Sequence, residues 1–248
     1  MIALAAGAVT LALTTVFTIA GVGAAFVLIP VFVSLGVEVH AAMATALLLN
    51  AVALSVASVR NARKGFIDFE TGLPILIVAT ALSPMGAWAS QGLDRRVLLG
   101  LFAAFLLVAA SLMLFHTPRA RVKRPSRRVA ALSGTAVGVA AGFLGGLLGV
   151  GGGNIIVPSL VATGMEPRRA SATTSFAVVF ASLAGFLGHA SRGGVEPALV
   201  AVTGSASAAG ALLGSWLMTE KLRGPAVKRL LGGVLLAVAA KVTFDAFR

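Results

Sequence analysis

A glycine-rich segment in the second half of the chain is the strongest candidate for a binding site. It reads Gly149-Val-Gly-Gly-Gly-Asn154, and Pro158 follows inside an apolar run. A half-helix that starts at Asn154 would point its free N–H groups and its dipole at an anion. Close packing of helices on glycine is the alternative, and we predict such packing for the row just upstream, Gly134, Gly138, Gly142 and Gly146. We predict that four residues of the glycine-rich segment bind the anion: Gly151, Gly152, Gly153 and Asn154.

Polar side chains inside apolar runs are the second set of candidates. Hydroxyl groups can hydrogen-bond an oxyanion without a fixed charge, although Ser and Thr also bond to the backbone of their own helix. The second half of the chain contributes Thr173, Thr174 and Ser175 to the predicted cavity. The first half contributes Gly21, Gly23, Thr45 and Asn50.

Charged and titratable residues lie near the ends of the apolar runs. Glu38 and Glu166 are expected to be solvated or to cap helices. Histidine side chains ordinarily titrate near neutral pH, so His40 and His189 could relay protons. Coupling of transport to protons therefore stays open beside an interfacial role for both imidazoles.

The motifs of common catalytic sites are missing from the sequence. The chain has no cysteine, no HExxH and no GxxxxGK[ST] loop, and its three histidines show no metal-ligand spacing. We predict that the protein is not an enzyme and has no catalytic residues, no metal and no cofactor.

The candidate residues belong to two copies of one unit. Gly21-Val-Gly-Ala-Ala-Phe-Val-Leu-Ile-Pro30 reappears as Gly149-Val-Gly-Gly-Gly-Asn-Ile-Ile-Val-Pro158, at an offset of 149 − 21 = 128 residues. The only two tryptophans, Trp88 and Trp216, fall on the same offset. We therefore predict a first repeat over 1–115 and a second over 129–248, with 116–128 as a linker. Duplication with broken helices is typical of transporters.

The composition places both repeats in a membrane. Hydrophobic residues make up 58% of the 248 residues, and the mean hydropathy is +0.99. Runs of about 20 apolar residues are long enough to cross a bilayer. They predict an all-α polytopic protein with eight membrane helices, near 2–20, 41–59, 72–90, 96–115, 129–148, 170–190, 196–217 and 226–246.

The length of the first apolar stretch requires a break in each repeat. A single helix over 1–36 would be about 54 Å long, whereas the hydrocarbon core is about 30 Å thick. We expect the chain to break at the glycines, so that 24–35 and 154–163 form half-helices or re-entrant segments. Such backbone is tolerated at membrane depth only where protein or a water-filled cavity surrounds it. Whether the repeats are parallel or inverted stays open.

The basic residues between the apolar runs predict the orientation. The net charge is +12, and the linker 116–128 holds six Lys or Arg residues and no acid. Lys and Arg accumulate on the cytoplasmic side of membrane proteins. We place the linker and both termini in the cytoplasm, with the protein in the inner membrane of a bacterial-type cell. The linker also suits contact with anionic lipid, and nucleic-acid binding is not expected.

The combined motifs resemble the TauE/SafE family of sulfite-exporter-like permeases. Gly149-Val-Gly-Gly-Gly-Asn-Ile-Ile-Val-Pro158 is similar to the second-half glycine motif of that family. Ala172-Thr-Thr-Ser175 is similar to the helix start, and Arg192-Gly-Gly-Val-Glu196 to the basic turn. The resemblance implies export of a small anion such as sulfite, a sulfonate or another organosulfur acid. The first repeat departs from the pattern at Ala24-Ala25, which favours a site in the second repeat.

Two other classes of function stay open. One is a transporter for a different substrate, a metal ion or a metabolite, although scarce intramembrane carboxylates disfavour a cation. The other is a non-transporting membrane subunit that holds a partner through its glycine rows. The oligomeric state also stays open, and a homodimer is compatible with the sequence.

Overall fold

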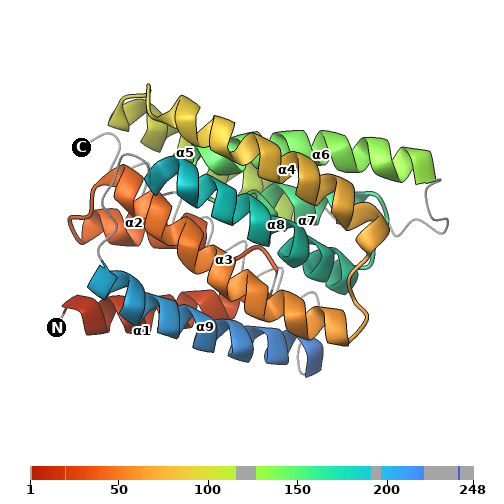
Figure 1. The fold of residues 1–248 in the computed structure, drawn as a ribbon, viewed down its shortest axis with the longest axis horizontal. Coiled ribbons are helices and arrows are strands. Elements are labelled where there is room, and N and C mark those ends of the chain that lie inside the picture. Colours follow the sequence, from red (N-terminus) through yellow and green to blue (C-terminus); the bar gives the residue numbers. More distant parts are fainter. Residues whose placement is uncertain (1, 20, 116–126, 191–196, 221–239, 241–248) are drawn as a thin grey trace.

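The computed structural model describes residues 2–19, 21–115, 127–190, 197–220 and 240. Every regular element within these ranges is an α-helix, which confirms the predicted all-α class (Figure 1). In chain order the helices are α1 (Ile2–Ile19), α2 (Ala25–Ser34), α3 (Val39–Arg63), α4 (Phe69–Ser90), α5 (Arg95–Phe115), α6 (Arg127–Leu147), α7 (Gly153–Ala162), α8 (Pro167–Ala190) and α9 (Pro197–Glu220).

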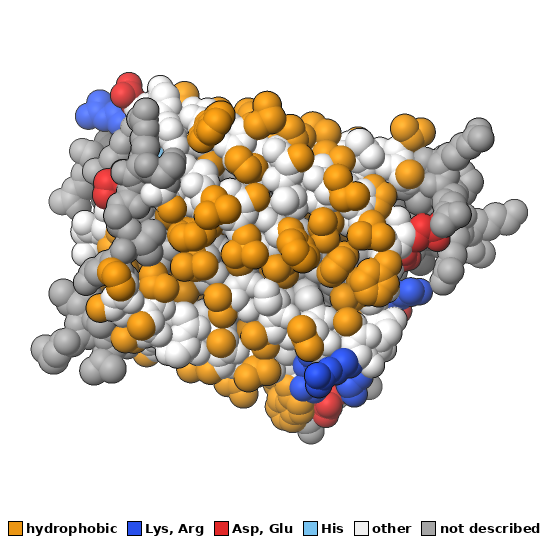
Figure 2. Space-filling view, in the orientation of Figure 1, with side chains coloured by type: hydrophobic (Ala, Val, Ile, Leu, Met, Phe, Trp, Pro, Cys, Tyr) orange, Lys and Arg blue, Asp and Glu red, His pale blue; other side chains and the backbone are white. Residues whose placement is uncertain are grey.

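Four of these helices are long and apolar enough to cross a membrane, judged by length and composition. They are Val39–Arg63, Phe69–Ser90, Arg168–Ala190 and Pro197–Met218. The predicted helix 226–246 and most of the linker 116–128 lie outside the described residues, so the arrangement of eight membrane helices stays a prediction. In Figure 2, hydrophobic side chains cover the middle of the visible face, and charged side chains gather toward its two ends. This distribution fits a protein surrounded by lipid.

Each half contains the predicted break. Glycines with positive φ separate α1 from α2 and α6 from α7, namely Gly21, Gly23, Gly149, Gly151 and Gly152. The helices that follow have 10 residues each, or about 15 Å. Neither α2 nor α7 can therefore span a hydrocarbon core of about 30 Å.

Equivalent helices of the two halves run in opposite directions. The ring of His189, near the end of α8, lies 6.0 Å from the ring of His40, at the start of α3. At the opposite end of the molecule, Thr173 near the start of α8 bonds to Asp68, which follows α3. Helices α3 and α8 are thus antiparallel neighbours (Figure 1). The orientation that the sequence left open is the inverted one for this pair.

The two halves are interleaved, because the first helix of each packs along the fourth helix of the other. Helix α6 packs along α4, and α1 packs along α9. On α6 the contact consists of a glycine row, in which a Cβ on Gly142 would lie 2.6 Å from Ala79 Cα. On the other side the glycines are on α9, where a Cβ on Gly210 would lie 2.7 Å from Leu11 O. The predicted packing role of the row Gly134, Gly138, Gly142 and Gly146 is confirmed.

The starts of α1 and α6 lie at opposite ends of the molecule. A Cβ on Gly7 would touch Val202, at the beginning of α9, whereas a Cβ on Gly134 would touch Thr71, at the beginning of α4. The prediction that the N-terminus and the linker share one face is therefore wrong. The physical reason is that α2 turns the chain back toward the end from which α1 came (Figure 1).

Candidate functional site

The two glycine breaks approach one residue, Asn50, near the middle of α3. A Cβ on Gly23 would overlap Asn50 Oδ1, and a Cβ on Gly151 would lie 2.8 Å from Asn50 Nδ2. Asn50 Nδ2 donates a hydrogen bond of 2.9 Å to Ser182 Oγ on α8. Asn50 is 1% exposed and Ser182 is fully buried. A polar pair thus lies in the interior, where backbone from both halves comes close.

The breaks also contact each other and the helices that cross beside them. A Cβ on Gly153 would lie 2.8 Å from Val22 O, so the second break is packed against the first. Ser175 Oγ donates to Gly21 O at 3.5 Å and to Ser171 O of its own helix at 2.9 Å. Predicted residues from both halves are therefore brought to one interior region, although they are separated by about half of the chain: Gly21, Gly23, Asn50, Gly151, Gly153 and Ser175.

Two helix N-termini begin in this region. Helix α2 follows Ala24 and helix α7 follows Gly152, and neither of these N-cap positions provides a side-chain hydrogen bond to its helix. Gly152 O accepts from the N–H groups of Ile155 and Ile156, at 3.0 and 3.2 Å. The amides of the first turn have no acceptor within their own helix. Each N-terminus carries a partial positive charge that favours an anion.

Several buried polar groups of the predicted site have no hydrogen-bond partner among the described residues. They are Asn50 Oδ1, Asn154 Nδ2 and Thr174 Oγ1. Asn154 is 8% exposed and Thr174 is fully buried. Unsatisfied buried polar groups are uncommon, because each costs about 1–3 kcal/mol when left without a partner. Asn154 and Thr174 are therefore available as donors to a ligand.

Other predicted residues are committed to the backbone. Thr173 Oγ1 accepts a 2.9 Å hydrogen bond from Asp68 N, which precedes α4. Asp68 in turn accepts from Thr71 N at 3.2 Å and caps α4. Thr45 is buried on α3, with 1% exposure. The fold thus uses Thr173 to position the start of α4.

Sequence reasoning missed Ser182, the partner of Asn50. It lies seven residues after Ser175, so both hydroxyls are on one face of α8, two helical turns apart. This spacing was a signal that could have identified Ser182. The duplication could not, because the matching position in the first half is Leu54.

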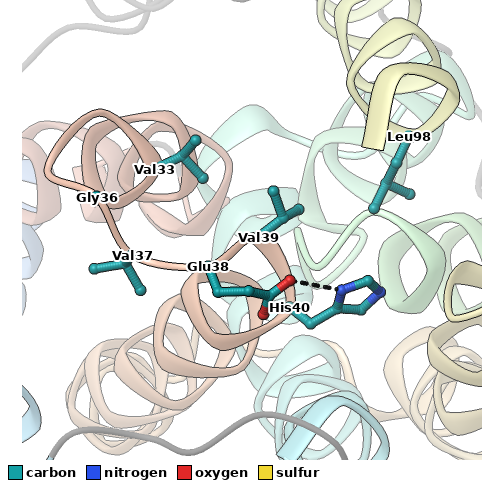
Figure 3. A pocket seen from close by; sticks show the side chains of 7 residues that line it. All are labelled: Val33, Gly36, Val37, Glu38, Val39, His40 and Leu98. Carbon is teal, nitrogen blue, oxygen red and sulfur yellow. Dashed lines mark hydrogen bonds and ion pairs between the residues drawn. The ribbon is translucent and has the colours of Figure 1, made fainter. Parts of the chain in front are cut away.

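A pocket of about 280 Å³ opens at the end of the molecule where α3 begins (Figure 3). Glu38 and His40 provide its polar lining, and Glu38 Oε1 lies 3.1 Å from His40 Nδ1. Burial acts to raise the pKa of the Glu38 carboxyl, but hydrogen bonds from the backbone of His40 and Ala41 and from the His40 ring hold that pKa below its ordinary value. The pocket therefore presents a carboxylate at neutral pH.

Comparison with known proteins identifies the group to which this chain belongs. Residues 5–242 match the family described as "Sulfite exporter TauE/SafE". The chain belongs to this family. It is a membrane transporter of the TauE/SafE type and not an enzyme.

Individual relatives are more distant. The "Probable membrane transporter protein YunE" of Bacillus subtilis (strain 168) is 25% identical over 207 residues, which are 73% of this chain and 76% of that protein. "Sulfite exporter TauE/SafE family protein 5" of Arabidopsis thaliana is 32% identical over 101 residues, 37% of this chain and 22% of that protein. "Sulfite exporter TauE/SafE family protein 6" of the same plant is 52% identical over 42 residues, 17% of this chain and 10% of that protein. No solved structure matches this TauE/SafE chain significantly.

Proposed function

We propose that this TauE/SafE transporter exports a small anion, namely sulfite, a sulfonate or a related organosulfur acid, by alternating access between its halves. The observation that carries the proposal is the meeting of two helix N-termini, α2 and α7, beside the buried pair Asn50 and Ser182. The name of the family and the names of the two plant relatives, which contain the words sulfite exporter, support the same class of substrate.

The chemistry of the region suits an oxyanion held by neutral donors. Among the described residues, the buried polar side chains belong to Ser, Thr, Asn and His, and none is Asp, Glu, Lys or Arg. In a protein interior, N–H and O–H donors and helix dipoles act more strongly than in water. They can therefore replace part of the hydration of an anion without a fixed opposite charge. We assign Gly151, Gly152, Gly153, Asn154 and Thr174 to the binding surface in the second half.

The antiparallel course of equivalent helices supports alternating access. Inverted repeats allow a transporter to exchange two conformations related by the pseudo-twofold axis, with the substrate near the midplane. The pair Asn50 and Ser182 joins α3 to α8, the two equivalent helices that pack on each other. We place the protein in the cytoplasmic membrane, with the basic linker 116–128 inside.

Sulfite and methanesulfonate efflux from liposomes that contain the purified protein tests the proposal. Asn50→Val gives α3 the residue that α8 has at the matching position, Val178, and removes the amide whose second N–H is left to donate to an anion. A hydrogen bond to a charged group is worth about 1.5–3 kcal/mol, so we expect efflux to fall by about tenfold or more. Ser205→Ala, at an exposed serine of α9 whose hydroxyl bonds to Val202 O, is the matched control.

The proposal is wrong if folded Asn50→Val protein, checked by gel filtration, transports both anions at the wild-type rate. It is also wrong if the wild-type protein transports neither anion in either direction.

A further inference from the structure

The two ends of the duplicated fold carry different side chains at matching positions. The offset of 128 residues pairs His40 with Arg168 and His189 with Asn61, whereas Glu38 is paired with another acid, Glu166. One end therefore has two imidazoles where the other has a guanidinium and an amide. Imidazole changes its charge near neutral pH, but Arg and Asn do not. At these two positions, only one end of the molecule carries side chains that change charge near neutral pH.

The titratable groups form a series that leads from the pocket into the interior. Glu38 Oε1 lies 3.1 Å from His40 Nδ1, and these side chains are 61% and 22% exposed. The ring of His40 lies 6.0 Å from the ring of His189, which is fully buried. Exposure thus falls in steps from a carboxylate that water reaches to an imidazole that water does not reach.

Each imidazole has one nitrogen in use and one buried nitrogen without a partner. His189 Nε2 lies 2.7 Å from Gly146 O, and a carbonyl only accepts, so this nitrogen carries the hydrogen. His189 Nδ1 and His40 Nε2 are buried without a partner among the described residues. A neutral imidazole with one donor in use has a lone pair on its other nitrogen. The pair therefore offers two unpaired nitrogens for a proton, on rings whose centres lie 6.0 Å apart.

The inner imidazole is connected to the second glycine break through one carbonyl. Gly146 O accepts from His189 Nε2 at 2.7 Å and also from Gly149 N at 3.2 Å. Gly149 is the first residue of the break that leads to Gly151 and α7. A charge on His189 strengthens its bond to Gly146 O and competes with the bond from Gly149. The protonation state is thereby tied to the backbone that we assign to the anion.

We propose that His40 and His189 form a proton-binding site, entered past Glu38, whose occupancy sets the position of the second glycine break during transport. The coupling to an anion rests on the proposed function, whereas the proton site itself does not. The ligand is a proton from the solvent at the α3 end of the molecule.

Among the residues that the structure describes, few other groups can control this site. Those whose charge acts on His189 are His40 and Glu38, and α6 faces it with the Gly146 carbonyl. Helix α4 contributes Gln91, which donates to Gly188 O at 3.1 Å and has no charge to change. Asp94 and Arg96, at the start of α5, are exposed. The pH response is therefore expected to come from the two imidazoles with Glu38.

Transport under an imposed pH gradient tests the coupling. Methanesulfonate is the suitable substrate, because its charge stays constant between pH 5 and 8. We expect the gradient to drive its accumulation in liposomes by the wild-type protein. In His189→Asn, which installs the residue of the other half, and in His40→Gln, downhill flux should persist while accumulation falls by about tenfold or more. His116→Gln, at the remaining histidine, is the control. Wild-type accumulation by both imidazole variants overturns the inference, as does downhill flux in the wild type that ignores the gradient.

A titration independent of transport separates this inference from the proposed function. Nitrogen NMR of labelled histidine in the intact protein follows both rings between pH 3 and 8. We expect His189 to change its titration when His40→Gln is introduced, and His40 to change in His189→Asn. This result supports the proton site even if no tested anion is transported. Independent titration of the two rings, or no titration of either, overturns it even if anions are transported.

Discussion

Asn50 on α3 donates its side-chain amide to Ser182 Oγ on α8, at 2.9 Å, where backbone from both halves of the chain comes close. The two helices are copies of each other, but the two residues are not, since Asn50 corresponds to Val178 and Ser182 to Leu54. The contact between these two equivalent helices therefore holds one Asn–Ser pair, with one member on each helix, and not two symmetric copies of it.

This pair should behave as one unit in unfolding. Asn50→Ala and Ser182→Ala each leave a buried partner unpaired, which we expect to cost about 1–3 kcal/mol. The double variant should cost clearly less than the sum, because it leaves nothing unpaired. Thermal unfolding in detergent measures the cycle, with Ser205→Ala as the surface control. Strict additivity would show that the 2.9 Å contact contributes nothing.

Gly23 and Gly36 illustrate two separate reasons why a position requires glycine: a backbone with positive φ, and a close approach that leaves no room for a Cβ. Both have positive φ, 71° and 90°, but a Cβ on Gly23 would overlap Asn50 whereas a Cβ on Gly36 meets nothing within 4 Å. Gly36→Ala should cost about 1 kcal/mol from backbone strain alone. Gly23→Ala should cost several times more, and Asn50→Ala should relieve most of that excess. Equal losses of stability for the two alanines would contradict this explanation.

Thr173 is expected to be a structural residue for α4. Thr173→Val removes the acceptor of Asp68 N and should lower the free energy of unfolding by about 1–3 kcal/mol. Thr173→Ser keeps the hydroxyl and should restore most of this loss. Anion efflux by the folded fraction should be close to wild type in both. Full stability with lost efflux in Thr173→Val would instead make the hydroxyl a ligand.

Glu38 should make part of the stability depend on pH. Its carboxylate accepts from Ala41 N at 2.9 Å and caps α3, and its pKa is held below the ordinary value of 4.5. Because the folded pKa is the lower one, this contribution is present above the unfolded pKa and is lost as the pH falls through the folded pKa. Glu38→Gln should therefore be less stable at pH 7, by about 1 kcal/mol. The difference should shrink and disappear as the pH falls through the folded pKa of Glu38; a constant difference at all pH values would contradict it.

The sequence predicted where the helices break and pack better than it predicted the directions in which they run. The breaks at Gly21–Gly23 and Gly149–Gly153 could be located, because a long apolar run and a membrane thickness leave few places for them. The row Gly134 to Gly146 predicted a helix contact, but periodicity does not identify the partner, which is α4 of the other half. Hydropathy also measures the length of a segment and not its course, so it left open whether 24–35 returns toward the end from which α1 came. For this reason the predicted shared face of the N-terminus and the linker was wrong. The bond of His189 to Gly146 depends on both these facts and required the structure.

The interleaving of the halves has a consequence for how the protein is made. Helix α1 packs mainly on α9, so Leu11 cannot make its contact with Gly210 until α9 has been synthesised. The ribosome adds about 5–20 residues per second, so α1 remains without this partner for about 10–40 seconds of synthesis. During that time its threonines at 10, 14 and 18, which are buried in the finished protein, face lipid or the insertion machinery. Biogenesis of this transporter therefore ends with a long-range docking step. In a chain that stops after the first repeat, α1 lacks its main packing partner.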